Sequence, residues 1–425
     1  SGIGTFYHSF SQNKPVSFNQ DMLWQIRYDR GGNHLFEIMA TMGILGFLSY
    51  LFILITNFKN FFSQKDQSKS MLLFIPFLAL TFAQLIFYQN TTLIFLFWFM
   101  MAILEISFEN KEKEEFSFSF GDIPEMKLIL KMISVVLVLI ILGTFYFLGK
   151  AYYADILYDK GANMPDGQDR INLLDEAIKW NPKLVQYMIS ASRANFTQSW
   201  IEINQAVNQE AASALFQQRI VKSIDIAKRA TEVSPNHVVA WETLGMIYRE
   251  INSMAGGEAL DWGLKSFQTA LELDPNNPVL HTELGKMYSA SEDLELAKQE
   301  FNLSLELKPD YSLAIIEKSK LLESGEESGE AVSLLEEFLK EHPLDIDAIF
   351  QLGRLYYNDN QIDKAISKLE KAVILSPNHS NALYTLGIAY NANGEKDKAL
   401  SVLNRVLELN PNNQELRSKI SEISK

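Results

Sequence analysis

The strongest constraint on the fold of this chain is a proline that returns at a fixed interval along its C-terminal half. Six prolines are separated by 40, 34, 34, 34 and 34 residues: Pro235, Pro275, Pro309, Pro343, Pro377 and Pro411. Two further columns repeat with them, a Leu-Gly pair followed by Tyr (Leu284-Gly285-Tyr288, Leu352-Gly353-Tyr356, Leu386-Gly387-Tyr390) and an alanine (Ala297, Ala331, Ala365, Ala399). Small residues let two helices approach closely, and proline loses least at the start of a helical unit. The columns therefore predict a stack of helical hairpins.

This pattern resembles the tetratricopeptide repeat (TPR), a helix-turn-helix unit that stacks into an α-solenoid. The repeat boundaries are 235–274, 275–308, 309–342, 343–376 and 377–410, preceded by diverged TPR-like repeats over 149–234 and followed by a capping helix over 411–425. The first unit has six extra residues around 252–258 (NSMAGGE), which predict a longer turn between its helices. The third unit is degenerate, because Lys318 and Ser319 stand where the other units have Leu and Gly.

The N-terminal part of the chain is much more apolar. Four apolar stretches of about 17–21 residues cover about 38–58, 71–88, 92–108 and 128–148. Roughly 20 helical residues cross the hydrocarbon core of a membrane. A helix of a soluble protein carries a polar stripe, and the stretch LILKMISVVLVLIILGTFYFLG has almost none. The sequence therefore predicts an all-α chain with a transmembrane domain at 38–148 before the TPR α-solenoid; helices buried in a large soluble core are the alternative.

The placement of lysine predicts the topology. The linkers 59–70 and 109–127 each carry three lysines, whereas the connection around 89–91 carries none. The positive-inside rule places the two lysine-bearing linkers in the cytoplasm. We therefore expect a multi-pass protein of a bacterial inner (cytoplasmic) membrane, in contact with membrane lipid. Residues 1–37, read as the end of an extracytoplasmic loop, and the TPR domain then lie outside the cytoplasm, in the periplasm or at the cell surface. Gln84, within a span, is expected to hydrogen-bond a neighbouring helix rather than a substrate.

Charge and composition exclude several classes of function. The 425 residues include 38 Lys and Arg against 52 Asp and Glu, and the net charge of −14 falls on the repeat-containing part. An acidic surface argues against nucleic acid as a partner. The absence of cysteine excludes disulfides, thiolate metal sites and a cysteine nucleophile. No P-loop, dinucleotide or paired-histidine zinc motif occurs, so we assign no metal and no cofactor. The chain starts at a serine in polar sequence, and we expect it to be the C-terminal portion of a longer protein.

The N-terminal stretch resembles the end of the large outer loop and the following helix of the O-antigen ligase/polymerase family. The matching segments are SGIGTFYHSFSQNKP and YDRGGNHLFEIMATMGILGFLSYLFIL, and the matching residues are Gly2, Gly4, nearby Phe6, Arg30, Asn33, Glu37 and Gly43-Ile44-Leu45-Gly46. The resemblance covers about residues 1–108, and family members with a C-terminal TPR array are familiar. In one departure, Asn33-His34 replaces the family's His-Asn pair, whose His falls on Gly32. Either His34 takes that role from two residues later, or the role is lost.

The resemblance implies a polytopic membrane glycosyltransferase that moves a glycan from a polyprenyl pyrophosphate to an acceptor hydroxyl. Cationic side chains stabilise the charge that develops on the pyrophosphate, and the acceptor needs a general base that works near neutral pH. We therefore assign His34 as the base, with Arg30 and Arg27 near the pyrophosphate. In the alternative interpretation, the two arginines bind lipid headgroups.

Two functions follow from these observations. The first is a metal-independent membrane glycan ligase or polymerase of cell-surface polysaccharide or glycoconjugate assembly, with a protein partner bound in its TPR groove. We expect these 425 residues to be inactive without the missing N-terminal part. The second function is a non-enzymatic, membrane-anchored TPR scaffold for protein–protein interaction, because a solenoid offers a concave surface to partners. The acceptor is left open among lipid, growing glycan and protein.

Overall fold

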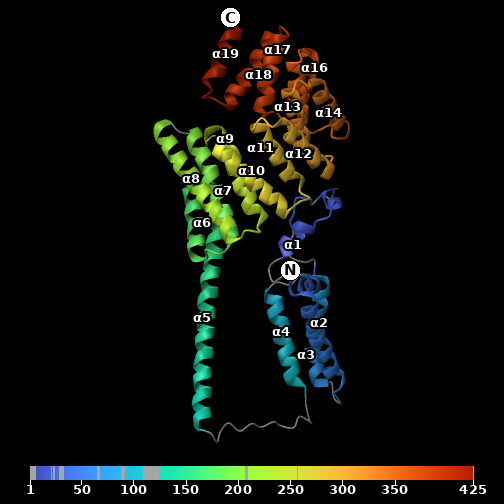
Figure 1. Cartoon of the computed structure of the whole chain (residues 1–425), viewed down its shortest axis with the longest axis vertical. Coiled ribbons are helices and arrows are strands. Elements are labelled where there is room, and N and C mark those ends of the chain that lie inside the picture. The colour runs from blue at the N-terminus through green and yellow to red at the C-terminus, as the bar shows by residue number, and fades with distance from the viewer. Residues whose placement is uncertain are drawn as a thin grey trace. The chain divides into compact units, whose positions relative to one another are not determined.

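The structure is a computed structural model that describes residues 6–20, 22, 24–27, 33–64, 68–87, 91–108, 124–205, 209–255 and 257–424. Within these ranges the regular elements are helices (Figure 1), so the all-α prediction is confirmed. The chain divides into two compact units, one made of residues 1–14 and 25–243 and the other of residues 15–24 and 244–425. The short helices α1 (Phe6–Asn13) and η1 (Val16–Gln20) therefore belong to different units.

In the first unit, the helices α2 (His34–Phe62), α3 (Ser68–Ile86) and α4 (Thr91–Ser107) form a small bundle held together by aromatic rings. Phe61 of α2 stacks on Phe74 of α3 with 3.7 Å between ring centroids. Phe77 of α3 stacks on Phe97 of α4 at 5.5 Å. Gln84 of α3 accepts a hydrogen bond from the Tyr50 hydroxyl of α2, which confirms its predicted role between helices.

The α2 helix is capped at its start and kinked near its middle. The Asn33 side-chain oxygen accepts a hydrogen bond from the Phe36 backbone N–H at 3.0 Å, which satisfies one free donor of the first turn. Gly43 has φ +70° and ψ −174°, which interrupts the helical backbone. A side chain is strained at such a φ, so a glycine is needed at the first position of the Gly43–Gly46 pattern.

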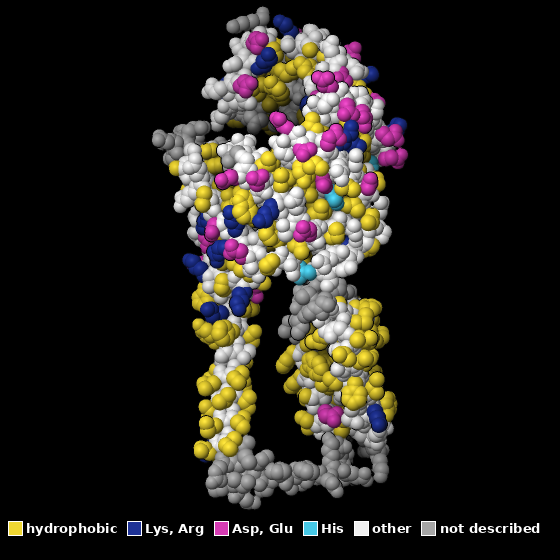
Figure 2. Space-filling model, viewed as in Figure 1, with side chains coloured by type: hydrophobic (Ala, Val, Ile, Leu, Met, Phe, Trp, Pro, Cys, Tyr) yellow, Lys and Arg dark blue, Asp and Glu magenta, His cyan; other side chains and the backbone are white. Residues whose placement is uncertain are grey.

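The α5 helix (Pro124–Ala162) joins the last apolar stretch directly to the helical repeats. Along the predicted 128–148 stretch the described large apolar side chains are 48–69% exposed, and Figure 2 shows apolar side chains along the face of this helix that is in view. Beyond that stretch Ala154 and Leu157 are buried in the first helical hairpin. By length and composition alone, α2 and the Lys131–Ala162 part of α5 could each cross a membrane, whereas α3 and α4 are shorter apolar helices.

The end of α5 packs against α6 (Gln168–Trp180), and α7 (Val185–Gln205) packs against α8 (Gln209–Val233). The α7–α8 pair is close because two serines face each other in the core. The Ser192 hydroxyl donates to the Ser223 carbonyl at 2.9 Å, and the Ser223 hydroxyl donates back to the Ser192 carbonyl at 2.8 Å. Two helical hairpins thus occupy the region predicted to hold diverged repeats.

The longer part of the second unit begins within α9, at residue 244, and continues as paired helices. They are α9 (Val238–Ala255), α10 (Gly257–Leu273), α11 (Pro278–Ala290), α12 (Leu294–Leu307), α13 (Ser312–Ser324), α14 (Ser328–Glu341), α15 (Ile346–Asn358), α16 (Ile362–Leu375), α17 (Ser380–Ala392), α18 (Lys396–Leu409) and the final α19 (Gln414–Ser424). The glycine column explains how each pair approaches closely. A Cβ at Gly285 would lie 2.6 Å from the Phe301 ring, and one at Gly387 would lie 2.6 Å from Leu403.

The six extra residues of the first repeat lengthen its helices instead of its turn, so the predicted longer turn is wrong. The α9 helix has 18 residues and α10 has 17, compared with 13 in α11 and 14 in α12. The extra turns are stabilised by burial, because Ile251 near the end of α9 and Ala259 near the start of α10 are both buried. Burial of an apolar face outweighs the turn preference of the two glycines in this segment.

Candidate protein-binding site

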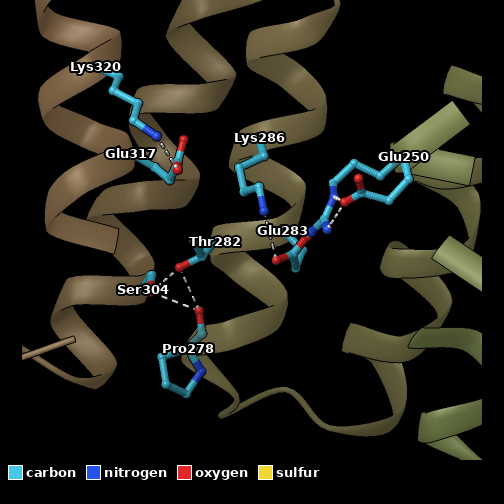
Figure 3. Close-up of polar contacts among 9 residues, drawn as sticks. Glu250, Pro278, Thr282, Glu283, Lys286, Ser304, Glu317 and Lys320 are labelled. Carbon is cyan, nitrogen blue, oxygen red and sulfur yellow. Dashed lines mark hydrogen bonds and ion pairs between the residues drawn. The ribbon is translucent and has the colours of Figure 1, made fainter. Parts of the chain in front are cut away.

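The first helices of successive repeats lie next to one another. Contacts join α11 to α13, α13 to α15 and α15 to α17. Figure 3 shows polar side chains of α9, α11 and α13, in which Glu283 and Lys286 of α11 lie between Glu250 of α9 and the Glu317–Lys320 pair of α13. In a solenoid, residues on such a continuous helical surface are available to a partner that lies across several repeats.

The same hydrogen-bonded pair occurs on this surface in three consecutive repeats. We define the charged row as Glu283, Lys286, Glu317, Lys320, Gln351 and Arg354. Within each helix the cation donates to the acceptor three residues earlier: Lys286 to Glu283 at 3.1 Å, Lys320 to Glu317 at 2.8 Å and Arg354 to Gln351 at 3.1 Å. Because the repeats are 34 residues long, the three pairs occupy equivalent positions.

Further ion pairs connect the charged row from one repeat to the next. Arg249 of α9 forms an ion pair with Glu283 of α11, and Arg354 of α15 forms one with Glu323 of α13. Asn358 adds a hydrogen bond to Glu323 at 2.7 Å. These contacts hold the row at fixed positions before any partner binds.

A buried pair of hydroxyl groups lies beside the charged row, between the two helices of one repeat. The Thr282 hydroxyl of α11 and the Ser304 hydroxyl of α12 lie 2.8 Å apart. Both donate to the Pro278 carbonyl, at 3.0 Å and 2.8 Å (Figure 3). This network ties the two helices of the repeat together next to Glu283.

The charged row is least buried at its α13 pair, whereas the acceptors of the other two pairs, Glu283 and Gln351, are both buried. The Glu283 side chain is 10% exposed, whereas the Lys320 side chain is 48% exposed. Burial, with a smaller contribution from the nearby Arg249, lowers the pKa of Lys286 to about 8. The α11 pair is therefore fixed and poorly hydrated, while the α13 pair can exchange its internal contact for one to a partner.

The site residues predicted from the sequence lie elsewhere. His34 begins α2, with its Nδ1 3.9 Å from a Glu37 carboxylate oxygen and its ring edge-on to Tyr50 at 6.2 Å. The Arg27 guanidinium donates two hydrogen bonds to the Glu242 carboxylate of α9. Arg30 lies outside the described residues. His34 and Arg27 thus have different partners.

The sequence did contain a signal for the charged row, although sequence reasoning missed it. The acceptors Glu283, Glu317 and Gln351 recur at the repeat interval, and so do the cations three positions later. Recognising them required knowing which helix face is shared between repeats, because the repeat-defining Leu, Gly and Tyr lie on the packed face. Among the described residues, no cluster of His, Cys, Asp or Glu is placed to hold a metal ion.

Comparisons with known families agree with the repeat geometry. Models of the tetratricopeptide repeat match residues 266–299, 319–380 and 359–423. The C-terminal part of the chain is a TPR protein-interaction scaffold. No curated protein matches the chain in sequence.

Several solved TPR structures are similar to this chain. One is a tetratricopeptide repeat protein from Parabacteroides merdae, at 16% identity and a TM-score of 0.48 over 64% of this chain and 100% of that one. Another is a thermophilic TPR protein from Thermus thermophilus, at 20% identity and a TM-score of 0.37 over 43% and 98%. A third is YrrB, a TPR protein with an unusual peptide-binding site, at 21% identity and a TM-score of 0.32 over 45% and 96%.

Proposed function

We propose that the protein is a membrane-anchored scaffold whose TPR array binds a segment of a partner protein along the charged row. The observation that carries this proposal is the recurrence of one hydrogen-bonded pair at the same position of three repeats. An extended segment has backbone groups and side chains at regular intervals, so a periodic surface can contact it at several points. Many modest contacts on a preorganised surface give affinity without a deep pocket.

The chemistry of the row supports a polypeptide ligand. Each of the three repeats presents its cation as a donor, because Lys286, Lys320 and Arg354 are more exposed than their acceptors, and such donors suit the C=O groups of a peptide. The ion pair of Lys320 with Glu317 contributes little stability because the Lys320 side chain is 48% exposed, so its replacement by a partner costs little. Glu283 forms ion pairs with both Arg249 and Lys286, so this end of the charged row is rigid.

Site-specific photo-crosslinking tests this proposal in the full chain within cells. A diazirine-bearing lysine analogue is placed at position 320 on α13, and a matched control carries it at position 398 on α18, where the lysine is also exposed. We expect position 320 to give a discrete protein adduct, several-fold stronger than any adduct at position 398. Equal adducts at both positions, or an adduct at position 398 alone, would contradict binding along the row.

The membrane anchor in this proposal consists of the apolar helices of the first unit. The apolar side chains of α5 between residues 128 and 148 are exposed all along the helix, which is unfavourable in water and favourable in lipid. The lysines of the two linkers orient the anchor with the TPR array outside the cytoplasm of a bacterium. The same helix then leads from the membrane into the first helical hairpin.

Glycan transfer by the full-length protein is the second candidate function. It is favoured by the resemblance of residues 1–108 to O-antigen ligases and polymerases, and by the retention of a histidine directly after Asn33. A polyprenyl pyrophosphate would have to compete with Glu242 for Arg27, because that guanidinium is already engaged.

The test is His34→Ala in the full-length protein, with transfer of a polyprenyl-pyrophosphate-linked glycan as the measured activity. Loss of transfer with normal membrane insertion is the expected result for a general base. Full activity of the variant would eliminate His34 from the mechanism. Complete absence of transfer in the unaltered protein would leave the scaffold as the function.

A further inference from the structure

A short N-terminal segment belongs to the second unit, together with the TPR array. We call Val16–Gln20 together with Trp24 the docked segment. It lies on two consecutive turns that each join the second helix of one repeat to the first helix of the next, at residues 274–277 and 307–311. These turns form the edge of the array and are separate from the charged row.

Asn19 connects the docked segment to both turns. Its side chain is 0% exposed, and its Nδ2 donates to the Asn276 carbonyl at 2.9 Å and to the Leu307 carbonyl at 3.3 Å. Its own carbonyl accepts a hydrogen bond from Lys308 Nζ at 3.0 Å. A buried side chain with partners on two turns fixes the position of the segment closely.

Lys308 and Tyr311 complete the contact. Lys308 is 7% exposed, and its Nζ also donates to Asp310 at 2.8 Å and lies 5.0 Å from the centre of the Trp24 ring. Trp24 meets Tyr311 edge-on, with 5.4 Å between ring centroids. The lysine is thus satisfied by a carbonyl, a carboxylate and an aromatic face, of which the first and last come from the docked segment.

These two residues break the pattern of the repeats. At the position of Tyr311, four other units have a residue whose side chain accepts a hydrogen bond from the start of the following helix: Asn277, Asp345, His379 and Asn413. Tyr311 makes no such bond, so α13 lacks a side-chain cap. At the position of Lys308 the other units have Asp274, His342, Ser376 and Asn410. The first repeat also lacks such a bond, because Nδ1 of His237 has no hydrogen-bond partner among the described residues, so the third repeat is distinguished by Tyr311 together with the buried Lys308.

We propose that the turns 274–277 and 307–311 form a binding site dedicated to the docked segment, and that the degenerate third repeat is adapted to build it. The array thereby holds the part of the chain that leads, ten residues later, to His34. This inference does not depend on binding along the charged row, because it uses the turns and different residues.

The test is chemical crosslinking of the full chain, which has no cysteine of its own. One variant carries Gln20→Cys and Pro309→Cys, which are direct neighbours of the bonded Asn19 and Lys308. The matched control carries Gln20→Cys and Pro343→Cys, the same position one repeat further on. With a short bis-maleimide, we expect intramolecular crosslinking several-fold higher for the 20/309 pair, independent of protein concentration. Equal yields for the two pairs would overturn the proposal.

Two further measurements separate a dedicated site from chance proximity. In the 20/309 background, Asn19→Ala and Tyr311→Asp should each reduce the crosslinked fraction several-fold, whereas Lys371→Ala, which alters the turn of the next repeat, should not. A synthetic peptide of residues 15–24 should compete with crosslinking, and the same peptide with Asn19→Ala should compete less. If neither the substitutions nor the peptide changes the yield, the site does not recognise this segment.

Discussion

At the scale of single residues, the glycine column decides how closely the helices of a repeat can pack. The space for a Cβ at Gly285 is taken by the ring of Phe301, which is itself buried. Gly329, near the start of α14, has no heavy atom within 4 Å of the position of an added Cβ. Gly285 is therefore required for the close packing of two helices, whereas Gly329 is a helical residue that a larger one can replace.

We predict opposite effects for alanine at these two positions. Gly285→Ala should destabilise its repeat by about 1–3 kcal/mol, because the added methyl group overpacks the core. Gly329→Ala should stabilise α14 by up to about 1 kcal/mol, because alanine favours a helix over glycine. Hydrogen exchange followed by mass spectrometry on peptides from α11–α12 and from α14 measures both effects. If both variants changed hydrogen-exchange protection by the same amount, the ring of Phe301 would not restrict the size of the side chain at position 285.

Lys286 gives a prediction about pH. Burial lowers its pKa from the ordinary value of 10.5 to about 8 in the folded state. Below pH 8 the lysine is charged in both states, and its burial costs stability in full. As pH rises from 8 to 10.5, the folded protein releases the proton before the unfolded chain does, so stability from this group increases. Lys286→Met should therefore be more stable than the unaltered protein below pH 8, by up to roughly 3 kcal/mol, and the difference should shrink toward pH 10.5.

Lys286→Arg is the charged control for this experiment. Arginine keeps its charge throughout the range, so this variant should lose stability relative to the unaltered protein as pH rises above 8. Denaturant unfolding at pH 7 and at pH 10.5 measures both variants. A stability difference for Lys286→Met that does not change with pH would mean that Lys286 is well hydrated.

At the scale of elements, α13 has no side-chain cap at its start. A substitution at Tyr311 can therefore change the stability of α13 and the binding of the docked segment in opposite directions. Tyr311→Asp should add a side-chain cap worth about 1 kcal/mol to α13. It should also remove the ring that contacts Trp24. We expect amide protection to rise in the first turn of α13 and to fall in Val16–Gln20. The reverse exchange in the next repeat, Asp345→Tyr, should lower amide protection in α15 without affecting the docked segment. If Tyr311→Asp lowered amide protection in both α13 and Val16–Gln20, this account would be contradicted.

The sequence predicted those elements whose pattern is set by local packing. The proline interval and the Leu, Gly and Tyr columns report the packed faces of helical hairpins, so the presence of TPR repeats could be predicted, and family models match them at residues 266–299 and 319–423. The extra residues 252–258 were misinterpreted because the glycines suggested a turn, while burial of Ile251 and Ala259 favours longer helices. The docking of Asn19 could not be predicted, because its partners are more than 250 residues away in sequence.

At the scale of the whole molecule, α5 carries two different surfaces in one helix. Its first part exposes apolar side chains on every side, and its last turns bury Ala154 and Leu157 against α6. No proline separates the two parts, and the helix continues through Gly149 to residue 162 beyond the predicted span. The helical repeats of the first unit therefore begin without a flexible linker after the apolar stretch.

The orientation of the anchor gives the last prediction, which uses the absence of cysteine from the chain. Ser63→Cys lies at the end of α2 in a lysine-bearing linker, and Lys396→Cys lies at the start of α18. With a membrane-impermeant maleimide on intact bacterial cells whose outer barrier is permeabilised, position 396 should be labelled and position 63 should be protected until the cells are lysed. Both variants should remain in the membrane fraction after carbonate extraction. Labelling of position 63 alone would place the TPR array in the cytoplasm and exclude an extracytoplasmic glycan acceptor. Extraction of both variants by carbonate would exclude the membrane anchor.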